Sequence, residues 1–154
     1  MIVDPNEARL RDFAESFADW SIDPGTPVLI ACSARKGPER APARDLYRGD
    51  LFRCAVRWAE SWDLPWVVLS GRHGIIAPDA VVEPYDHQGF EGGVGHHDLR
   101  RQLLDLNLPA HPVAVIGGNE YVAAATHWLG NVWPVLQELP LRGYGYYKRW
   151  LTMS

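Results

Sequence analysis

The stretch Pro27-Val28-Leu29-Ile30-Ala31-Cys32 is apolar throughout and is followed at once by a polar loop. Two later stretches repeat this pattern, Pro65-Trp66-Val67-Val68-Leu69-Ser70 and Pro112-Val113-Ala114-Val115-Ile116. Short continuous apolar runs are typical of strands that are buried on both faces, as in a parallel sheet. The three runs therefore predict the central strands of one sheet.

Helical patterns separate these strands. Asp4 can cap a helix over residues 5–20, which we expect to be peripheral. A second helix is expected over Ala43–Trp62, a short one after Asp98, and another that stops at Gly130. The alternation of strands and helices predicts an α/β fold with a mostly parallel sheet flanked by helices.

Length and composition fit one such domain over residues 1–154. The chain has 47% apolar and 22% charged residues, which excludes a disordered or low-complexity protein. Its apolar runs are far shorter than the roughly 18 residues of a membrane helix, and no leader pattern begins it, so we expect a cytoplasmic protein without membrane contact. A net charge of −4 favours a small ligand over nucleic acid as the partner. The oligomeric state is left open.

Polar residues follow each predicted strand. In parallel sheets, ligands bind where loops leave the carboxyl ends of the strands, so these residues are expected at one edge. Ser33, Arg35 and Lys36 suit a phosphate, and the alternative is a solvated basic loop. Cys32 is either a nucleophile with His73 as its base or, as we favour, an apolar end of the strand that contacts the substrate.

The second strand leads into Ser70, Arg72 and His73. A hydroxyl, a cation and an imidazole within one turn can orient a sugar or a base, and the alternative is a purely structural turn. Gly117 and Gly118 follow the third strand and allow close approach of an anion to a helix N-terminus.

A long irregular loop is expected from Ile75 to His97. Its acidic residues Glu83 and Asp86 can stabilise a cationic sugar, and Tyr85 can stack on a base. The alternative is a turn with solvated carboxylates. The histidine and cysteine spacings match no metal motif, so neither a metal nor another cofactor is expected.

Several motifs together resemble a small uncharacterised family of bacteria and phages that is distantly similar to the peroxide-stress YaaA proteins. The motifs are Cys32-Ser33-x-x-Lys36, Ala43-Arg44-Asp45-Leu46-Tyr47 with Leu51-Phe52, Leu69-Ser70-x-x-His73-Gly74-Ile75, Glu83-Pro84-Tyr85-Asp86, Gly117-Gly118-x-x-Tyr121 and Pro140-Leu141-x-Gly143. The resemblance adds Tyr47 to the expected substrate-binding residues. It also implies a link to oxidative stress and DNA binding, although the YaaA proteins carry a further DNA-binding element.

The pattern as a whole favours an enzyme that acts on a nucleoside, nucleotide or nucleobase by cleaving or transferring an N-glycosidic bond. His73 and the two acids Glu83 and Asp86 are the expected catalytic residues. Two alternatives stay open: a YaaA-like nucleic-acid-binding stress protein without catalysis, and a binding module for a small metabolite.

Overall fold

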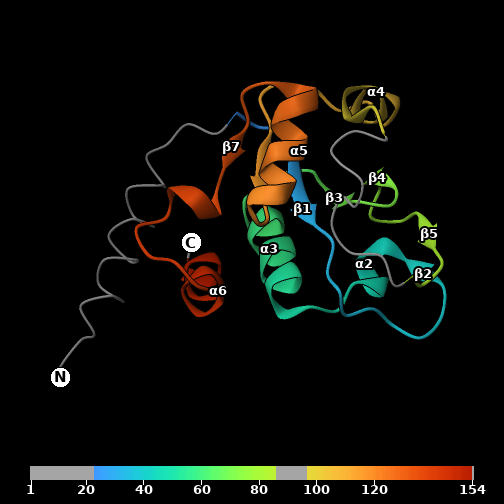
Figure 1. The fold of residues 1–154 in the computed structure, drawn as a ribbon, viewed down its shortest axis with the longest axis horizontal. Coiled ribbons are helices and arrows are strands. Elements are labelled where there is room, and N and C mark those ends of the chain that lie inside the picture. Colours follow the sequence, from blue (N-terminus) through green and yellow to red (C-terminus); the bar gives the residue numbers. More distant parts are fainter. Residues whose placement is uncertain (1–22, 86–96, 154) are drawn as a thin grey trace.

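A computed structural model describes residues 23–85 and 97–153 (Figure 1). The helix expected over residues 5–20 and the candidate acid Asp86 lie outside these residues. The strands are β1 Val28–Ala31, β2 Ala41–Pro42, β3 Trp66–Ser70, β4 Gly74–Ile76, β5 Val81–Val82, β6 Ala114–Ile116 and β7 Trp133–Pro134. The helices are α2 Ala43–Leu46, α3 Asp50–Ser61, α4 Leu99–Asp105, α5 Asn119–Leu129, α6 Tyr144–Met153 and the 3-10 turn η1 Leu136–Glu138.

The expected α/β fold is confirmed. A five-stranded sheet runs in the order β4-β3-β1-β6-β7, and β2 pairs with β5 in a separate two-stranded ribbon. β1 lies at the centre and is parallel to both neighbours, with Val28 opposite Trp66 on β3 and opposite Ala114 on β6. Among the five described strands of this sheet, β4 alone is antiparallel, and it pairs with β3. The carboxyl ends of the three predicted strands therefore meet at one edge.

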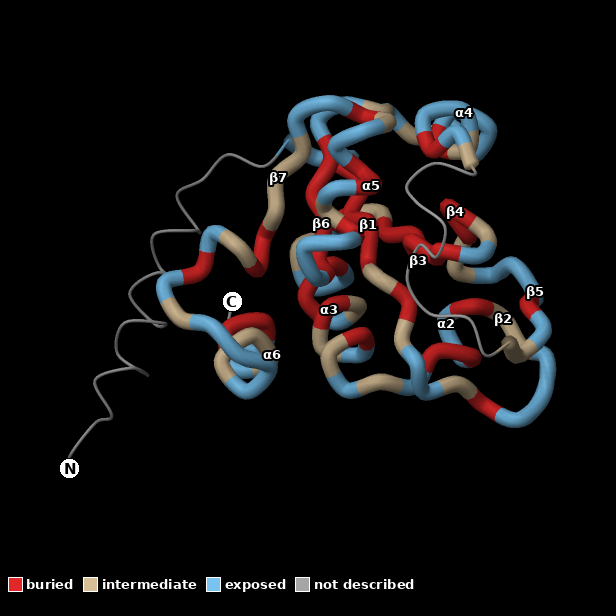
Figure 2. The backbone as a smooth tube through the Cα atoms, viewed as in Figure 1, coloured by how far each residue is buried: buried red, intermediate tan, exposed pale blue. Residues whose placement is uncertain are grey.

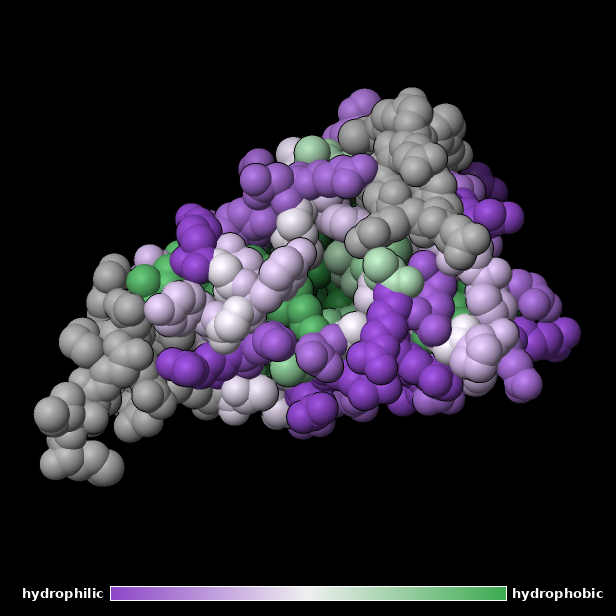
Figure 3. Space-filling view, turned by 60° about the horizontal axis from the view of Figure 1, so that its bottom comes forward, coloured by the Kyte–Doolittle hydropathy of each residue, from purple (hydrophilic) through white to green (hydrophobic). Residues whose placement is uncertain are grey.

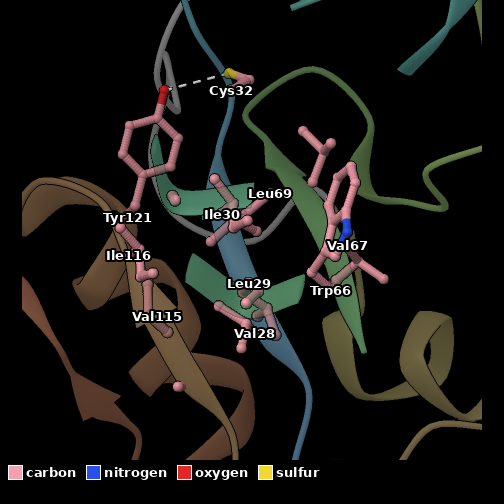
Figure 4. Packing of buried hydrophobic residues seen from close by; sticks show 14 of the residues in the cluster. Val28, Leu29, Ile30, Cys32, Trp66, Val67, Leu69, Val115, Ile116 and Tyr121 are labelled. Carbon is pink, nitrogen blue, oxygen red and sulfur yellow. Dashed lines mark hydrogen bonds between the residues drawn. The ribbon is translucent and has the colours of Figure 1, made fainter. Parts of the chain in front are cut away.

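Helices pack in two pairs around the sheet. α3 contacts β1, β3 and α6, whereas α4 contacts α5 and β4 (Figure 1). The buried residues run through β1, β3 and β6 (Figure 2), which explains why these strands read as uninterrupted apolar runs. At the end of β1, Tyr121 of α5 points toward Cys32, with 3.4 Å between the hydroxyl oxygen and the sulfur (Figure 4).

The single helix expected over Ala43–Trp62 was wrong. Two helices, α2 and α3, fill this range, and Tyr47 between them has an extended backbone. The break arises because the chain pairs with the loop after β1: Lys36 bridges to Tyr47, and the Arg48 N–H donates to the Arg35 carbonyl. A long-range contact of this kind overrides local helix propensity.

The segment expected to be irregular from Ile75 to His97 is more ordered in its first part. β4 forms a hairpin with β3, and β5 pairs with β2. The predicted start of α4 is confirmed, since the Asp98 carboxylate accepts a hydrogen bond from the Arg101 N–H at 3.1 Å. The predicted end of the next helix is confirmed too, because α5 stops at Gly130, which has a φ of 77°.

Within residues 23–85 and 97–153, none of the helices combines the length and the apolar character that crossing a membrane would need.

Candidate functional site

The carboxyl edge of the sheet is hollowed. Figure 3 turns this edge toward the reader and shows hydrophobic residues in the hollow with hydrophilic ones around it. Two cavities open here, and we name them the edge cleft and the flank cavity. Their linings show which of the expected site residues the fold brings together.

The edge cleft has a volume of about 320 Å³ and lies between the ends of β1 and β6 and the start of α3. Four of the expected residues line it: Cys32, Ser33, Gly117 and Gly118. It lies at the point where connections leave β1 and β6 toward opposite sides of the sheet, the usual ligand position in such folds. Sequence reasoning missed four further lining residues: Asp50, Tyr121, Tyr144 and Lys148.

The Ser33 hydroxyl is already engaged. It donates to the Arg35 carbonyl at 2.6 Å and accepts from the Gly49 N–H at 3.1 Å. Ser33 therefore fixes the start of α3. Its hydroxyl group already has two hydrogen-bond partners within the protein, so the expected role in binding a phosphate has no support from this geometry. Arg35 has an exposed side chain that lines neither the edge cleft nor the flank cavity.

A cluster of hydroxyl groups lies beside the flank cavity, which Tyr85 lines. The hydroxyl oxygens of Tyr47 and Tyr85 are 2.5 Å apart, and Ser70 Oγ lies 2.8 Å from the Tyr85 oxygen. Tyr47 and Ser70 are fully buried, so they hold Tyr85 and do not contact a ligand directly. The Cys32 thiol, which lines the edge cleft, also lies close enough to the Tyr85 hydroxyl to raise its pKa.

Burial controls the acidity of the two tyrosines. Burial raises the pKa of Tyr47 far above its ordinary value, and the hydrogen bond to Tyr85 raises it further. Burial also raises the pKa of Tyr85, while the hydrogen bonds from Ser70 and Tyr47 oppose that effect. Both hydroxyls thus keep their protons at neutral pH and act as hydrogen-bond donors.

Three basic side chains surround the Tyr85 ring. The Lys36 ammonium lies 4.3 Å from the ring centre, and the Arg72 guanidinium carbon lies 5.5 Å from it. The His73 ring meets the Tyr85 ring edge-on, with 5.2 Å between the centroids. These cation–π contacts hold Lys36 and Arg72 at the site before any ligand binds. They also occupy part of the ring surface that the sequence suggested for stacking on a base.

The flank cavity has a volume of about 700 Å³ and lies beside β4 and β5. Four expected residues line it together: Arg72, His73, Glu83 and Tyr85. Much of the remaining wall is apolar, with the side chains of Ile75, Ile76, Ala80 and Val82. A largely apolar cavity of this size with a few polar groups is typical of small-molecule sites.

Of the two expected catalytic acids, Glu83 is the one that lies within the described residues. Its side chain is 75% exposed, and its ion pair with Arg40 is 4.0 Å long. An exposed pair at this distance is weak, so the carboxylate can turn to another positive charge.

The turn that carries His73 is held from α4. The Gln102 side chain donates to the His73 carbonyl at 3.0 Å and accepts from the Ile75 N–H at 2.8 Å. Gly74 between them has a φ of 72°, and a Cβ there would lie 2.3 Å from the Gln102 amide oxygen. The turn thus requires glycine at this position.

Burial lowers the pKa of His73, and the positive charge of Arg72 and the neighbouring His97 lower it further. The imidazole is therefore neutral at pH 7 and can accept a proton. His97 packs here because its ring Nε2 donates to the Arg72 carbonyl at 2.7 Å. No sequence motif marks Gln102 or His97, since their partners lie more than twenty residues away.

The fold thus divides the expected site into two neighbouring parts. The edge cleft is lined by Cys32, Ser33, Gly117 and Gly118, and the flank cavity by Arg72, His73, Glu83 and Tyr85. The other expected residues that the structure describes line neither cavity: Arg35, Lys36, Tyr47 and Ser70. In the part of the chain that the structure describes, no group of three or more His, Cys, Asp and Glu side chains is arranged to hold a metal ion.

Comparison with known proteins gives one family and one relative. Over 135 residues the chain is 27% identical to the uncharacterized protein YfjM of Bacillus subtilis (strain 168), which covers 77% of this chain and 87% of YfjM. No solved structure matches the chain. The similarity to YaaA proteins stays a prediction, because neither match tests it. A family model matches residues 28–153, and the chain therefore belongs to DUF6884, a family of unknown function.

Proposed function

We propose that this protein is an enzyme that binds a nucleoside or nucleotide in the flank cavity and cleaves or transfers its N-glycosidic bond. One observation carries the proposal: a weakly paired carboxylate (Glu83), a neutral imidazole (His73) and a cation (Arg72) share one largely apolar cavity. The apolar wall suits the flat face of a base, and the polar end suits the sugar.

The three groups match the needs of the reaction. Cleavage of an N-glycosidic bond passes through a cationic sugar, which the Glu83 carboxylate would stabilise in the transition state. Neutral His73 would accept a proton from the attacking water. Arg72, held beside Tyr85 at 5.5 Å, would pair with a phosphate of the substrate.

The step balances as a hydrolysis. The water oxygen forms a bond to the anomeric carbon while the bond between that carbon and the base nitrogen breaks. The bonding electron pair leaves with the base. His73 takes one proton from the water and returns it to the leaving nitrogen, so the protein ends in its starting state. Transfer differs only in that a second base or alcohol replaces water.

The test is the release of free base from a panel of nucleosides and nucleotides, followed by chromatography. Glu83→Gln should lower turnover by about 10²–10⁴ and leave affinity within a few-fold, because the carboxylate acts mainly in the transition state. Glu39→Gln is the matched control: Glu39 is also an exposed glutamate, and it lines neither cavity. We expect it to turn over at the wild-type rate.

Two results would contradict the proposal. One is wild-type protein that binds members of the panel but releases no base from any of them, which would indicate a metabolite-binding module. The other is a Glu83→Gln variant as active as wild type.

A cytoplasmic site of action also stays a prediction from the sequence.

A further inference from the structure

A groove between two helices gathers four positively charged side chains. α3 and α6 pack side by side (Figure 1), and a cavity of about 450 Å³ opens along their contact. We name it the α3/α6 groove. Its charged lining residues are Arg53, Arg57, Lys148, Arg149 and Asp50. Four cations thus face one carboxylate.

Within the described residues, most of this charge is not neutralised by ion pairs. Lys148 is 3.9 Å from Asp50, a long and partly exposed ion pair. Arg53, Arg57 and Arg149 are exposed and form no ion pair with any residue in the ranges 23–85 and 97–153. Unpaired guanidinium groups bind phosphate oxygens in a two-pronged geometry.

The groove continues into the candidate site. Asp50 and Lys148 line both the α3/α6 groove and the edge cleft, so the two spaces adjoin. The flank cavity lies beyond the edge cleft, because its lining comes from β4 and from the turn after β3, and β3 is the neighbour of β1 in the sheet. The three spaces therefore follow one another along a line across the strand ends.

The length of this line distinguishes between ligands. From β4 to β6 it crosses three strand spacings, or about 14 Å at roughly 4.8 Å per spacing. The phosphates of a mononucleotide are attached close to its own sugar. They do not extend from the flank cavity across the edge cleft to the groove. A ligand that fills all three must have several nucleotide units.

The net charge of −4 does not argue against a negatively charged ligand with several nucleotide units. Residues 1–22 and 86–96 together contain seven acidic and two basic residues, so the acidic excess of the sequence arises there. The cations of the groove come from two helices outside these segments. Local charge on one face, rather than the total, governs binding to phosphates.

We infer that the α3/α6 groove binds the phosphodiester backbone of a single-stranded nucleic acid, and that the nucleotide in the flank cavity is one unit of that strand. The inference rests on the proposed function for the nucleotide in the cavity. A single strand is specified because a base inside a duplex stack cannot enter a cavity without leaving the stack.

The test measures binding alone, so it does not depend on catalysis. The probe is a 5′-fluorescein-labelled single-stranded oligonucleotide of twelve mixed bases, followed by anisotropy between 50 and 200 mM salt with the full chain. We expect wild type to bind, with affinity that falls as salt rises. Arg53→Gln/Arg57→Gln should bind at least tenfold more weakly at 50 mM salt. Its slope of log affinity against log salt should be smaller by about 1.4, since each phosphate contact on a single strand contributes about 0.7.

Arg100→Gln/Arg101→Gln is the control, because it removes two exposed arginines from α4, away from the groove. It should bind as wild type does. The inference is overturned if wild type does not bind the oligonucleotide, or if the α3 variant binds it unchanged. It is also overturned if a nucleoside triphosphate competes as well as the oligonucleotide at equal phosphate, or if only phosphatidylserine vesicles bind. Oligonucleotide binding that depends on Arg53 and Arg57, without base release from any substrate, supports the groove and contradicts the glycosidic proposal.

Discussion

The Ser70 hydroxyl donates its hydrogen bond to the Tyr85 hydroxyl over 2.8 Å, and not the reverse. The direction follows from the other partners of Ser70 Oγ, which accepts from the backbone N–H groups of Arg72 and His73 at 3.2 Å each. With both lone pairs used, only its own proton is left for Tyr85. Ser70 therefore joins the turn that carries His73 to Tyr85, which lines the flank cavity.

This arrangement predicts that Ser70→Ala is destabilising. The variant leaves two part-buried N–H groups and one tyrosine hydroxyl without their partner, which should cost about 1–3 kcal/mol. Urea unfolding measures the change. Ser61→Ala is the control: Ser61 is exposed and its hydroxyl donates to the Trp58 carbonyl at 2.7 Å, so its loss should cost under about 0.5 kcal/mol. Equal effects of the two substitutions would contradict the hydrogen-bond assignment.

A second prediction concerns stability at high pH. Burial raises the pKa of Tyr47 above the value of about 10 that the unfolded chain shows, so the folded state holds this proton more tightly. The contribution is complete below pH 10 and is lost above it, by up to about 1.4 kcal/mol per pH unit. Urea unfolding from pH 8 to 11 should show a decline that is less steep in Tyr47→Phe. Tyr144→Phe, at a position that is 70% exposed, is the matched control and should decline as wild type does.

The parts of the fold that the sequence predicts well are those with a local signal. The three apolar runs locate β1, β3 and β6 because strands buried on both faces need no polar alternation. Asp98 marks the start of α4 through its capping side chain, and Gly130 marks the end of α5 through its backbone conformation. Both effects act within one helical turn and are therefore visible in the local sequence.

The parts that the sequence misses depend on distant contacts. The break before α3 comes from the pairing of Tyr47 with Lys36, and β5 is a two-residue strand that forms by pairing with β2. The candidate site shows the same division. The residues after each strand are predicted, whereas Lys148 reaches the edge cleft from a C-terminal helix, and no local pattern announces it.

A third prediction concerns the titration of His73. Burial and the charge of Arg72 lower its pKa, so the ring should lose its proton at a pH below the ordinary histidine value of about 6.5. The NMR chemical shift of its Cε1 proton gives the midpoint, and His73→Gln assigns the signal. Arg72→Gln should raise the midpoint because it removes a positive charge. If the catalytic role holds, base release should fall on acidification with the same midpoint as the ring, and a rate that is flat across this range would exclude His73 as the base.

The last prediction compares two adjacent glycines of the edge cleft. A Cβ on Gly117 would lie 2.7 Å from the Ala31 Cβ and 3.2 Å from the Tyr121 Cβ, so β6 approaches β1 and α5 more closely than alanine allows. Gly117→Ala must therefore shift a packed strand or helix, at a cost of about 1–3 kcal/mol. A Cβ on Gly118 meets nothing within 4 Å, and its φ of −70° is ordinary for alanine.

Gly118→Ala should leave the free energy of unfolding within about 0.5 kcal/mol of wild type. The methyl group restricts the unfolded chain, which offsets the weaker helix capping by alanine. Urea unfolding of both variants measures the difference, and the pair controls itself because the two substitutions are chemically identical and one residue apart. Gly117→Ala as stable as Gly118→Ala would show that the end of β6 is not packed against Ala31 as described, and the position of the edge cleft between β1 and β6 would then be wrong.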